Sequence, residues 1–104
     1  MMLRDIAHTR SGDKGDTSNI SVIAFNPADY ELLRREITSE RVKQVLGAMV
    51  QGDVERYELP RLGALNFVLH RALAGGVTRS LALDIHGKCL GSLLLSIQIK
   101  GERA

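Results

Sequence analysis

An apolar segment that lies between a polar stretch and an Asn-Pro pair constrains the fold of this chain more than any other feature. Residues 20–25 read Ile-Ser-Val-Ile-Ala-Phe, which gives apolar character on both faces of an extended chain. This pattern predicts a buried strand over residues 19–25. Asn26 can then accept hydrogen bonds from the free N–H groups of a first helical turn, and Pro27 at the first helical position has no N–H to lose. The sequence therefore predicts a change from strand to helix within two residues.

Hydrophobic spacing along the rest of the chain predicts further strands and helices. We expect strands at residues 3–9, 53–59, 81–85 and 93–99. We expect one helix from Pro27, a second from residue 38 or 39 to a stop at Gly52, and a third over residues 65–73. The third helix has its apolar residues on one helical face, namely Leu65, Val68, Leu69, Ala72 and Leu73. A Gly pair at 75–76 would end that helix, and His86-Gly87 would form the last turn.

The length of the chain and the order of these segments favour a single α+β domain over residues 1–104. A domain of this size can bury roughly 65% of the surface that its unfolded chain exposes. Aromatic residues make up only 4% of the sequence and there is no Trp, so the core must be aliphatic. Several charged residues in the strand at 53–59 suit an edge position. We expect a ferredoxin-like sandwich, with helices on one face of a mainly antiparallel sheet.

Charge and composition argue against several classes of function. The net charge is +2, but basic and acidic residues are interleaved, so we do not expect nucleic-acid or membrane-surface binding. No apolar run approaches the ~20 residues that span a bilayer. Charged Arg4 and Asp5 near the start argue against a signal peptide. The single Cys89 cannot form an intramolecular disulfide, which agrees with a reducing compartment, and we expect a cytoplasmic protein.

The most unusual segment is the polar stretch 10–19, Arg-Ser-Gly-Asp-Lys-Gly-Asp-Thr-Ser-Asn. Its composition predicts a loop between two strands. Gly12 and Gly15 can take positive φ angles and turn their N–H groups inward, which makes a concave nest that suits anions. Arg10 adds a planar fork for a carboxylate or phosphate, and Lys14 adds a point charge. The candidate ligand-binding residues are therefore Arg10, Ser11, Gly12, Asp13, Lys14, Gly15, Asp16 and Asn19.

Two carboxylates in this stretch leave alternatives open. Asp13 and Asp16 count against an anion site unless they pair with Arg10 and Lys14 or hold a cation. The spacing of glycines and carboxylates does not match a P-loop, a dinucleotide-binding fingerprint or an EF-hand. The plain alternative is a tight hairpin connection whose Asp and Ser side chains bond only to their own backbone.

No catalytic arrangement can be identified from spacing alone. His8, Asp13 and Lys14 are the candidates for an acid–base site, because His8 lies at a strand end beside the polar stretch; a structural histidine is the favoured interpretation. Asn66 and His70 would share one face of the third helix. There is no second Cys and no cluster of His, so we expect no zinc site. We also expect no cofactor.

The polar stretch also resembles a family signature. Arg10-Ser-Gly-Asp-Lys-Gly-Asp16 followed by Asn19-Ile20 is similar to the signature of the AtuA-like ferredoxin-fold domain. Two further segments match, at residues 62–67 and from Gly75-Gly76 to Lys88. The sequence departs from the family pattern at Ser21, where Gly is expected. That domain is the C-terminal part of proteins linked to acyclic terpene utilisation, and it also occurs as a separate short chain.

The resemblance implies a ferredoxin-like fold and a role beside a larger AtuA-type protein. On that basis we expect an accessory or small subunit on a separate polypeptide, associated by context with terpenoid or acyl-CoA catabolism. Its polar stretch would complete a site at the shared interface. The alternative is an autonomous, homo-oligomeric small-molecule enzyme that uses the same stretch. The resemblance carries over no catalytic residues, and the sequence leaves open whether the domain is an enzyme.

Overall fold

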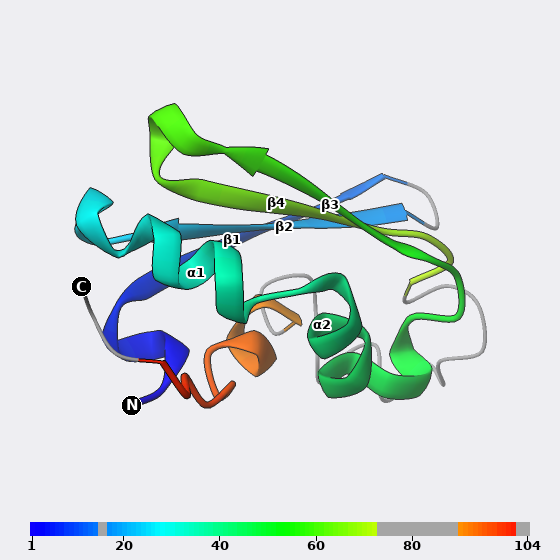
Figure 1. The fold of residues 1–104 in the computed structure, drawn as a ribbon. Helices are drawn as coiled ribbons and strands as arrows, with labels where there is room; N and C mark the ends of the chain where they lie inside the picture. The colour runs from blue at the N-terminus through cyan, green and yellow to red at the C-terminus, as the bar shows by residue number, and fades with distance from the viewer. Residues whose placement is uncertain (15–16, 73–89, 102–104) are drawn as a thin grey trace.

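An antiparallel sheet forms the centre of the protein. The computed structural model describes residues 1–14, 17–72 and 90–101 (Figure 1). The strands of the described sheet are β1 (Ala7–Lys14), β2 (Thr17–Ala24), β3 (Val54–Leu59) and β4 (Ala64–Leu69). Their order is β1-β2-β4-β3, so β1 and β3 are the edges of this sheet. Strands β1 and β2 form one hairpin, β3 and β4 form another, and β2 pairs with β4.

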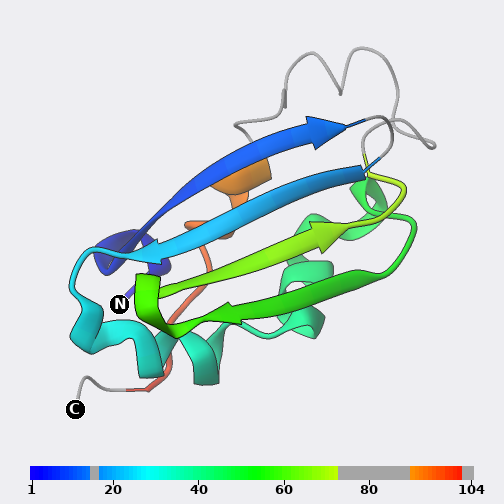
Figure 2. The same ribbon diagram turned by 90° about the horizontal axis from the view of Figure 1, so that it is seen from above.

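Helices cover one side of this sheet, as the two views at right angles show (Figures 1 and 2). Asn26 accepts a hydrogen bond from the amide of Ala28 at 3.0 Å and starts a 3₁₀ turn that leads into α1 (Tyr30–Glu36). Thr38 accepts from the amide of Arg41 at 3.2 Å and caps α2 (Ser39–Leu46). Both helix starts were predicted from the sequence, and both are confirmed. A helical segment at residues 90–94 lies on the same side of the sheet.

The core lies between these helices and the sheet. Alternate residues of β2 and β4 point into it, and the following are buried: Ser18, Ile20, Val22, Ala24, Leu65, Phe67 and Leu69. The opposite side of the sheet has no helix over it in the described part of the chain, and we call it the open face (Figure 2). By the strand register, the open face consists of His8, Arg10, Gly12, Lys14, Thr17, Asn19, Ser21, Ile23, Glu55, Tyr57, Leu59, Ala64, Asn66 and Val68.

The expected loop at residues 10–18 is mostly strand, so this prediction was wrong. Strand β1 starts later than expected, at Ala7, and runs to Lys14, while β2 begins at Thr17. Polar residues continue the strand because β2 lies alongside and pairs with every residue of β1. The alternating geometry then sends every second polar side chain to the open face, where water can solvate it. The prediction that this strand is buried was correct for one face only, since Asn19 is exposed and Ser21 and Ile23 are half-buried on the open face.

The third predicted helix is instead the central strand β4. The apolar residues of the segment fit helical spacing, but over residues 64–69 they also alternate, and short apolar segments are ambiguous in this way. Strands β2 and β3 pair with β4 on its two sides. Leu65 and Phe67 are fully buried, while Asn66 between them lies on the open face. Pairing across the sheet therefore decides the structure of this segment, against its helical spacing.

The C-terminal strand predicted at residues 93–99 is only partly present. Residues 90–94 are helical, because Leu90 and Leu94 at helical spacing both enter the core. The chain then extends beside the N-terminus, where the amide of Leu3 donates to the Ile97 carbonyl at 2.8 Å. The stop of α2 was also misplaced, since α2 ends at Leu46 and not at Gly52. Glycine at position 52 instead lets the backbone pass close to His70, because a Cβ there would lie 2.6 Å from the His70 carbonyl oxygen.

The predicted edge strand at 53–59 is confirmed as β3. The strand predicted at 81–85, the turn at 86–87 and the Gly pair at 75–76 lie outside the described residues. The class is α+β, with an antiparallel sheet and helices on one face, as expected for a ferredoxin-like fold. Within the described residues, no helix has the length and apolar content needed to cross a bilayer.

Candidate functional site

The polar stretch 10–19 forms the end of the β1–β2 hairpin. Lys14 pairs with Thr17, so only Gly15 and Asp16 lie between the strands, and these two are outside the described residues. Gly12 pairs with Asn19, and Arg10 pairs with Ser21. The expected concave nest at Gly12 is not formed, because among the described glycines only Gly47 and Gly63 have positive φ. Gly12 is an extended strand residue.

The register explains why position 12 suits glycine. A Cβ there would lie 2.9 Å from Oδ1 of Asn19, the residue paired with it across the hairpin. The Asn19 side chain therefore lies against Gly12 on the open face. It takes the space that a side chain at position 12 would need.

Three motif residues share the open side of β1. Arg10, Gly12 and Lys14 alternate with Ser11 and Asp13, so the first three belong to the open face and the other two to the core side. Arg10 is exposed, and none of the hydrogen bonds or ion pairs among the described residues involves it. Two basic positions four residues apart on one strand are about 13 Å apart, with the glycine between them. This is the part of the motif that can meet an acidic group.

The core side of the hairpin packs against the helical segment at 90–94. A Cβ on Gly91 would lie 2.7 Å from Oγ1 of Thr9 and 2.9 Å from Oγ of Ser11, so the helix approaches β1 closely at this glycine. The Ser11 hydroxyl is buried and has no hydrogen-bond partner in the described structure. Ser11 therefore does not belong with Arg10 on one binding surface. The motif is divided between the two sides of the sheet.

The predicted acid–base candidates are not brought together. His8 and Lys14 are six residues apart on one strand, which corresponds to roughly 20 Å. Asp13 pairs with Ser18 and belongs to the other side of the sheet. The exposed His8 ring stacks on Phe25, with ring centroids 5.4 Å apart and an interplanar angle of 20°. A single copy of the chain therefore does not assemble an acid–base site from these three residues.

Polar side chains on β3 and β4 form a second cluster on the open face. The amide of Asn66 donates to Oγ of Ser21 at 2.9 Å, across the β2–β4 pair. Glu55 accepts from the Tyr57 hydroxyl at 3.2 Å and lies 3.3 Å from Nε2 of His70. Both bonds lower the pKa of Glu55, and the bond to His70 has the larger effect. The Glu55 carboxylate in turn raises the pKa of Tyr57. The sequence placed Asn66 and His70 on a shared helical face, whereas a strand and the turn after it position them.

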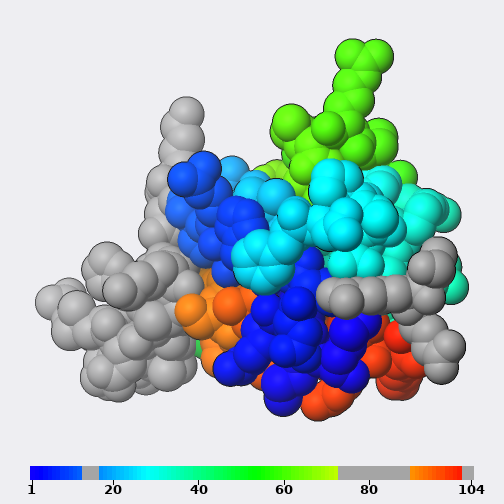
Figure 3. All heavy atoms as spheres, turned by 90° about the vertical axis from the view of Figure 1, so that its left-hand side faces the viewer, coloured from blue at the N-terminus to red at the C-terminus, as the bar shows by residue number. Residues whose placement is uncertain are grey.

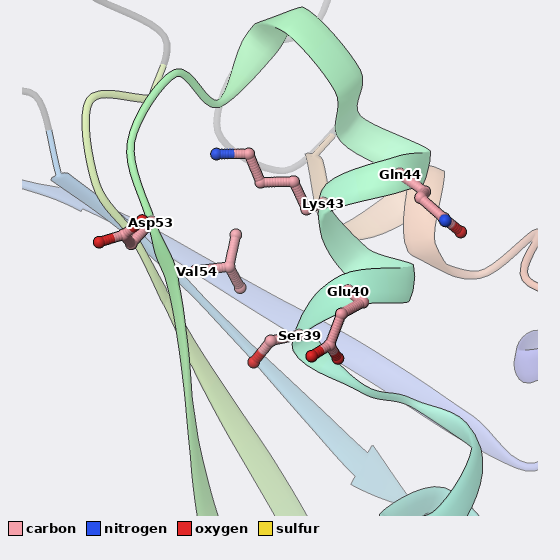
Figure 4. A pocket seen from close by; sticks show the side chains of 6 residues that line it. All are labelled: Ser39, Glu40, Lys43, Gln44, Asp53 and Val54. Atoms are coloured by element: carbon pink, nitrogen blue, oxygen red, sulfur yellow. The ribbon is translucent and has the colours of Figure 1, made fainter.

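A groove between α2 and the start of β3 was missed by the sequence analysis. It is open to solvent, has a volume of about 580 Å³, and is lined by Ser39, Glu40, Lys43, Gln44, Asp53 and Val54 (Figure 4). The Lys43 amino group points into the space between helix and strand and donates to the Gly52 carbonyl. Lys43 and the two carboxylates give the groove mixed charge, which does not select one ligand. No sequence pattern could reveal it, because its walls come from elements that only the fold brings together.

Clusters of metal-ligating side chains are not found in the described part of the chain. No group of three or more His, Cys, Asp or Glu side chains there could hold a metal ion. The expected alternatives for Asp13 and Asp16, local ion pairs or a bound cation, involve Asp16, which lies outside the described residues.

Comparison with protein families gives one match. The family model of the AtuA ferredoxin-like domain matches residues 1–100, almost the whole chain. The chain belongs to this family. Comparison with curated proteins and with solved structures gave no match. The expected family and fold are thus confirmed, and in this chain Arg10, Gly12 and Asn19 lie on the open face.

Proposed function

We propose that this AtuA ferredoxin-like domain is an accessory domain that acts together with a larger AtuA-type protein, in terpenoid or acyl-CoA catabolism. Its hairpin would contribute to a site at the shared interface by binding an acidic group, either a carboxylate or a phosphate. The observation that carries the proposal is the position of Arg10. This residue is exposed on the open face, two positions from Gly12, and the described residues offer it no acidic partner.

The chemistry of the hairpin supports an acidic group of small size. The Arg10 guanidinium can bind a carboxylate or phosphate through two parallel N–H donors. Lys14 shares the open side of β1 and adds a second positive charge. Asn19 lies between these two positions on the neighbouring strand, where its side chain supplies uncharged polar groups. An acid bound by Arg10 would lie close to Asn19, which pairs with Gly12 two positions along β1.

The test is affinity purification of the tagged chain from its source cells, followed by intact mass measurement. The proposal predicts a larger AtuA-type protein in stoichiometric amount. Recovery of the chain without any larger protein would contradict the proposal, and turnover by the recovered chain would favour the autonomous homo-oligomeric small-molecule enzyme. In that case, turnover of acyl-CoA or hydroxy-acid substrates that is lost in Asp13→Asn would be the deciding assay.

A further inference from the structure

Exposed hydrophobic residues gather at one end of the open face. Phe25 is 64% exposed, Leu62 69%, Tyr57 50% and Leu59 36%. Only Met1 and Val45 are comparably exposed large hydrophobic residues elsewhere in the described chain. Side chains of this kind that cluster on one surface mark interaction sites more often than scattered ones do.

The hydrophobic residues belong to two features at this end of the sheet. One is the pair of stacked rings of His8 and Phe25, at the start of β1 and just after β2. The other is the β3–β4 turn with Leu59 and Leu62, which lines an apolar groove of about 270 Å³. This turn rises from the sheet on the side away from the helices (Figure 1), and it projects above the neighbouring segments when this end is viewed directly (Figure 3).

We propose that the open face binds a second copy of this chain, with the β3–β4 turn of each copy packed against the His8–Phe25 pair of the other. The dimer and the larger protein proposed above would both use the open face, so the two associations would alternate on one chain. The dimer follows from the positions of the two features. The ring pair lies at the β1–β2 side of the sheet, and the turn lies at the β3–β4 side. A two-fold axis parallel to the strands reverses the strand order of the facing copy, so β1 of one copy lies over β3 of the other. The raised turn of each copy then reaches the ring pair of the other, and both contacts form at once.

The same axis gives compatible neighbours along the face. At the level of His8, Ile23 comes opposite Ala64 of the second copy, a small residue that is buried within its own copy and does not project from the face. Two residues further along the strands, Arg10 comes opposite Tyr57 of the second copy. A guanidinium can stack on an aromatic ring and still present its N–H edge to an acid. Self-association therefore leaves Arg10 able to bind an anion.

The available area suits a dimer of modest affinity. Four strands spaced ~4.8 Å apart and six paired residues of ~3.3 Å each give a flat projection on the order of 400 Å² per copy. Side-chain relief and the raised turn increase this area, so two copies bury on the order of 1,000 Å², the lower end for specific interfaces. Association should therefore depend on concentration in the micromolar range.

Sedimentation or light scattering of the purified chain from about 5 to 200 μM tests the proposal. We expect dimer mass at the upper concentrations, and monomer for Phe25→Asp and for Leu62→Asp. Val45→Asp is the matched control, because Val45 is 37% exposed on α2, on the other side of the sheet. We expect this variant to stay dimeric. A monomeric wild type at every concentration, or variants at both contact positions that remain dimeric while folded by circular dichroism, would overturn the proposal.

Cross-linking tests the orientation separately. In a Cys89→Ser background, mixing Phe25→Cys with Leu62→Cys under oxidation should give a disulfide-linked pair. Mixing Val45→Cys with Leu62→Cys should not. Equal cross-linking in both mixtures would reject the two-fold arrangement. Because these experiments use the purified chain alone, their failure would leave the proposed association with a larger AtuA-type protein untouched.

Discussion

The close contact between Gly91 and β1 allows a quantitative test of the packing beneath the hairpin. In Gly91→Ala, the new Cβ would lie 2.7 Å from Oγ1 of Thr9, 2.9 Å from Oγ of Ser11 and 3.1 Å from Cβ of Thr9. Ordinary contacts lie at about 3.5–4.0 Å, so the helical segment would have to move away from β1. The Thr9 side chain cannot easily change rotamer to relieve this contact, because β-branched residues have a restricted χ1. Overpacking of this kind typically costs about 1–3 kcal/mol.

A second effect acts in the opposite direction. Ala is favoured over Gly by up to ~1 kcal/mol inside a helix, and residues 90–94 are helical. The net expectation is destabilisation by about 1 kcal/mol, which corresponds to a decrease of roughly 4–8 °C in Tm for a domain of this size. Urea denaturation followed by circular dichroism measures it.

A double-mutant cycle separates packing from helix propensity. Thr9→Ala removes the oxygen that lies closest to the new Cβ, so Gly91→Ala should cost less in that background, with a coupling energy of about 1 kcal/mol. The reasoning is refuted if Gly91→Ala stabilises the wild-type protein, as helix propensity alone predicts. An equal cost in both backgrounds would refute it as well.

Three further predictions concern the core, a helix cap and an ion pair. Phe67→Ala should destabilise the domain by about 3–5 kcal/mol, because Phe67 is fully buried on β4, whereas Val68→Ala on the open face should cost much less; comparable losses in urea denaturation would contradict the strand assignment. Thr38→Ala should lower the free energy of unfolding by about 0.5–2 kcal/mol because Arg41 loses its capping acceptor, and Thr38→Ser should restore most of it in the same assay. Since the bond to His70 lowers the pKa of Glu55, the stability from that bond is present above the unfolded pKa of about 4.3 and is lost as pH falls through the lower folded value. An NMR titration should show the Glu55 midpoint rising towards its ordinary value in His70→Ala, and an unchanged midpoint would refute the assignment.

The predictions that succeeded rest on local chemistry. The caps at Asn26 and Thr38 involve residues two or three positions apart, so the sequence contains all that is needed to recognise them. The segment at residues 64–69 failed for the opposite reason. Its apolar spacing fits a helix and a strand, and only β2 and β3 on its two sides, distant in sequence, select the strand.

The candidate site was predictable in part for the same reason. Residue type alone singled out the stretch from Arg10 to Asn19. Which residues face the same way depends on the register of β1 against β2, which composition does not reveal. Once that register is known, Arg10, Gly12 and Asn19 separate from Ser11, and the expected nest at Gly12 becomes an open strand surface. The interpretation of the motif thus changes although its residues do not.

Affinity purification of the wild type beside the double variant Arg10→Ala/Lys14→Ala tests the central claim most directly. Arg35→Ala is the matched control, because it removes an exposed arginine from α1 on the helical side of the sheet. We expect a stoichiometric AtuA-type partner with the wild type and the control, and its loss or strong depletion with the double variant. Equal recovery of that partner with all three proteins would contradict the assignment of the hairpin as the binding element.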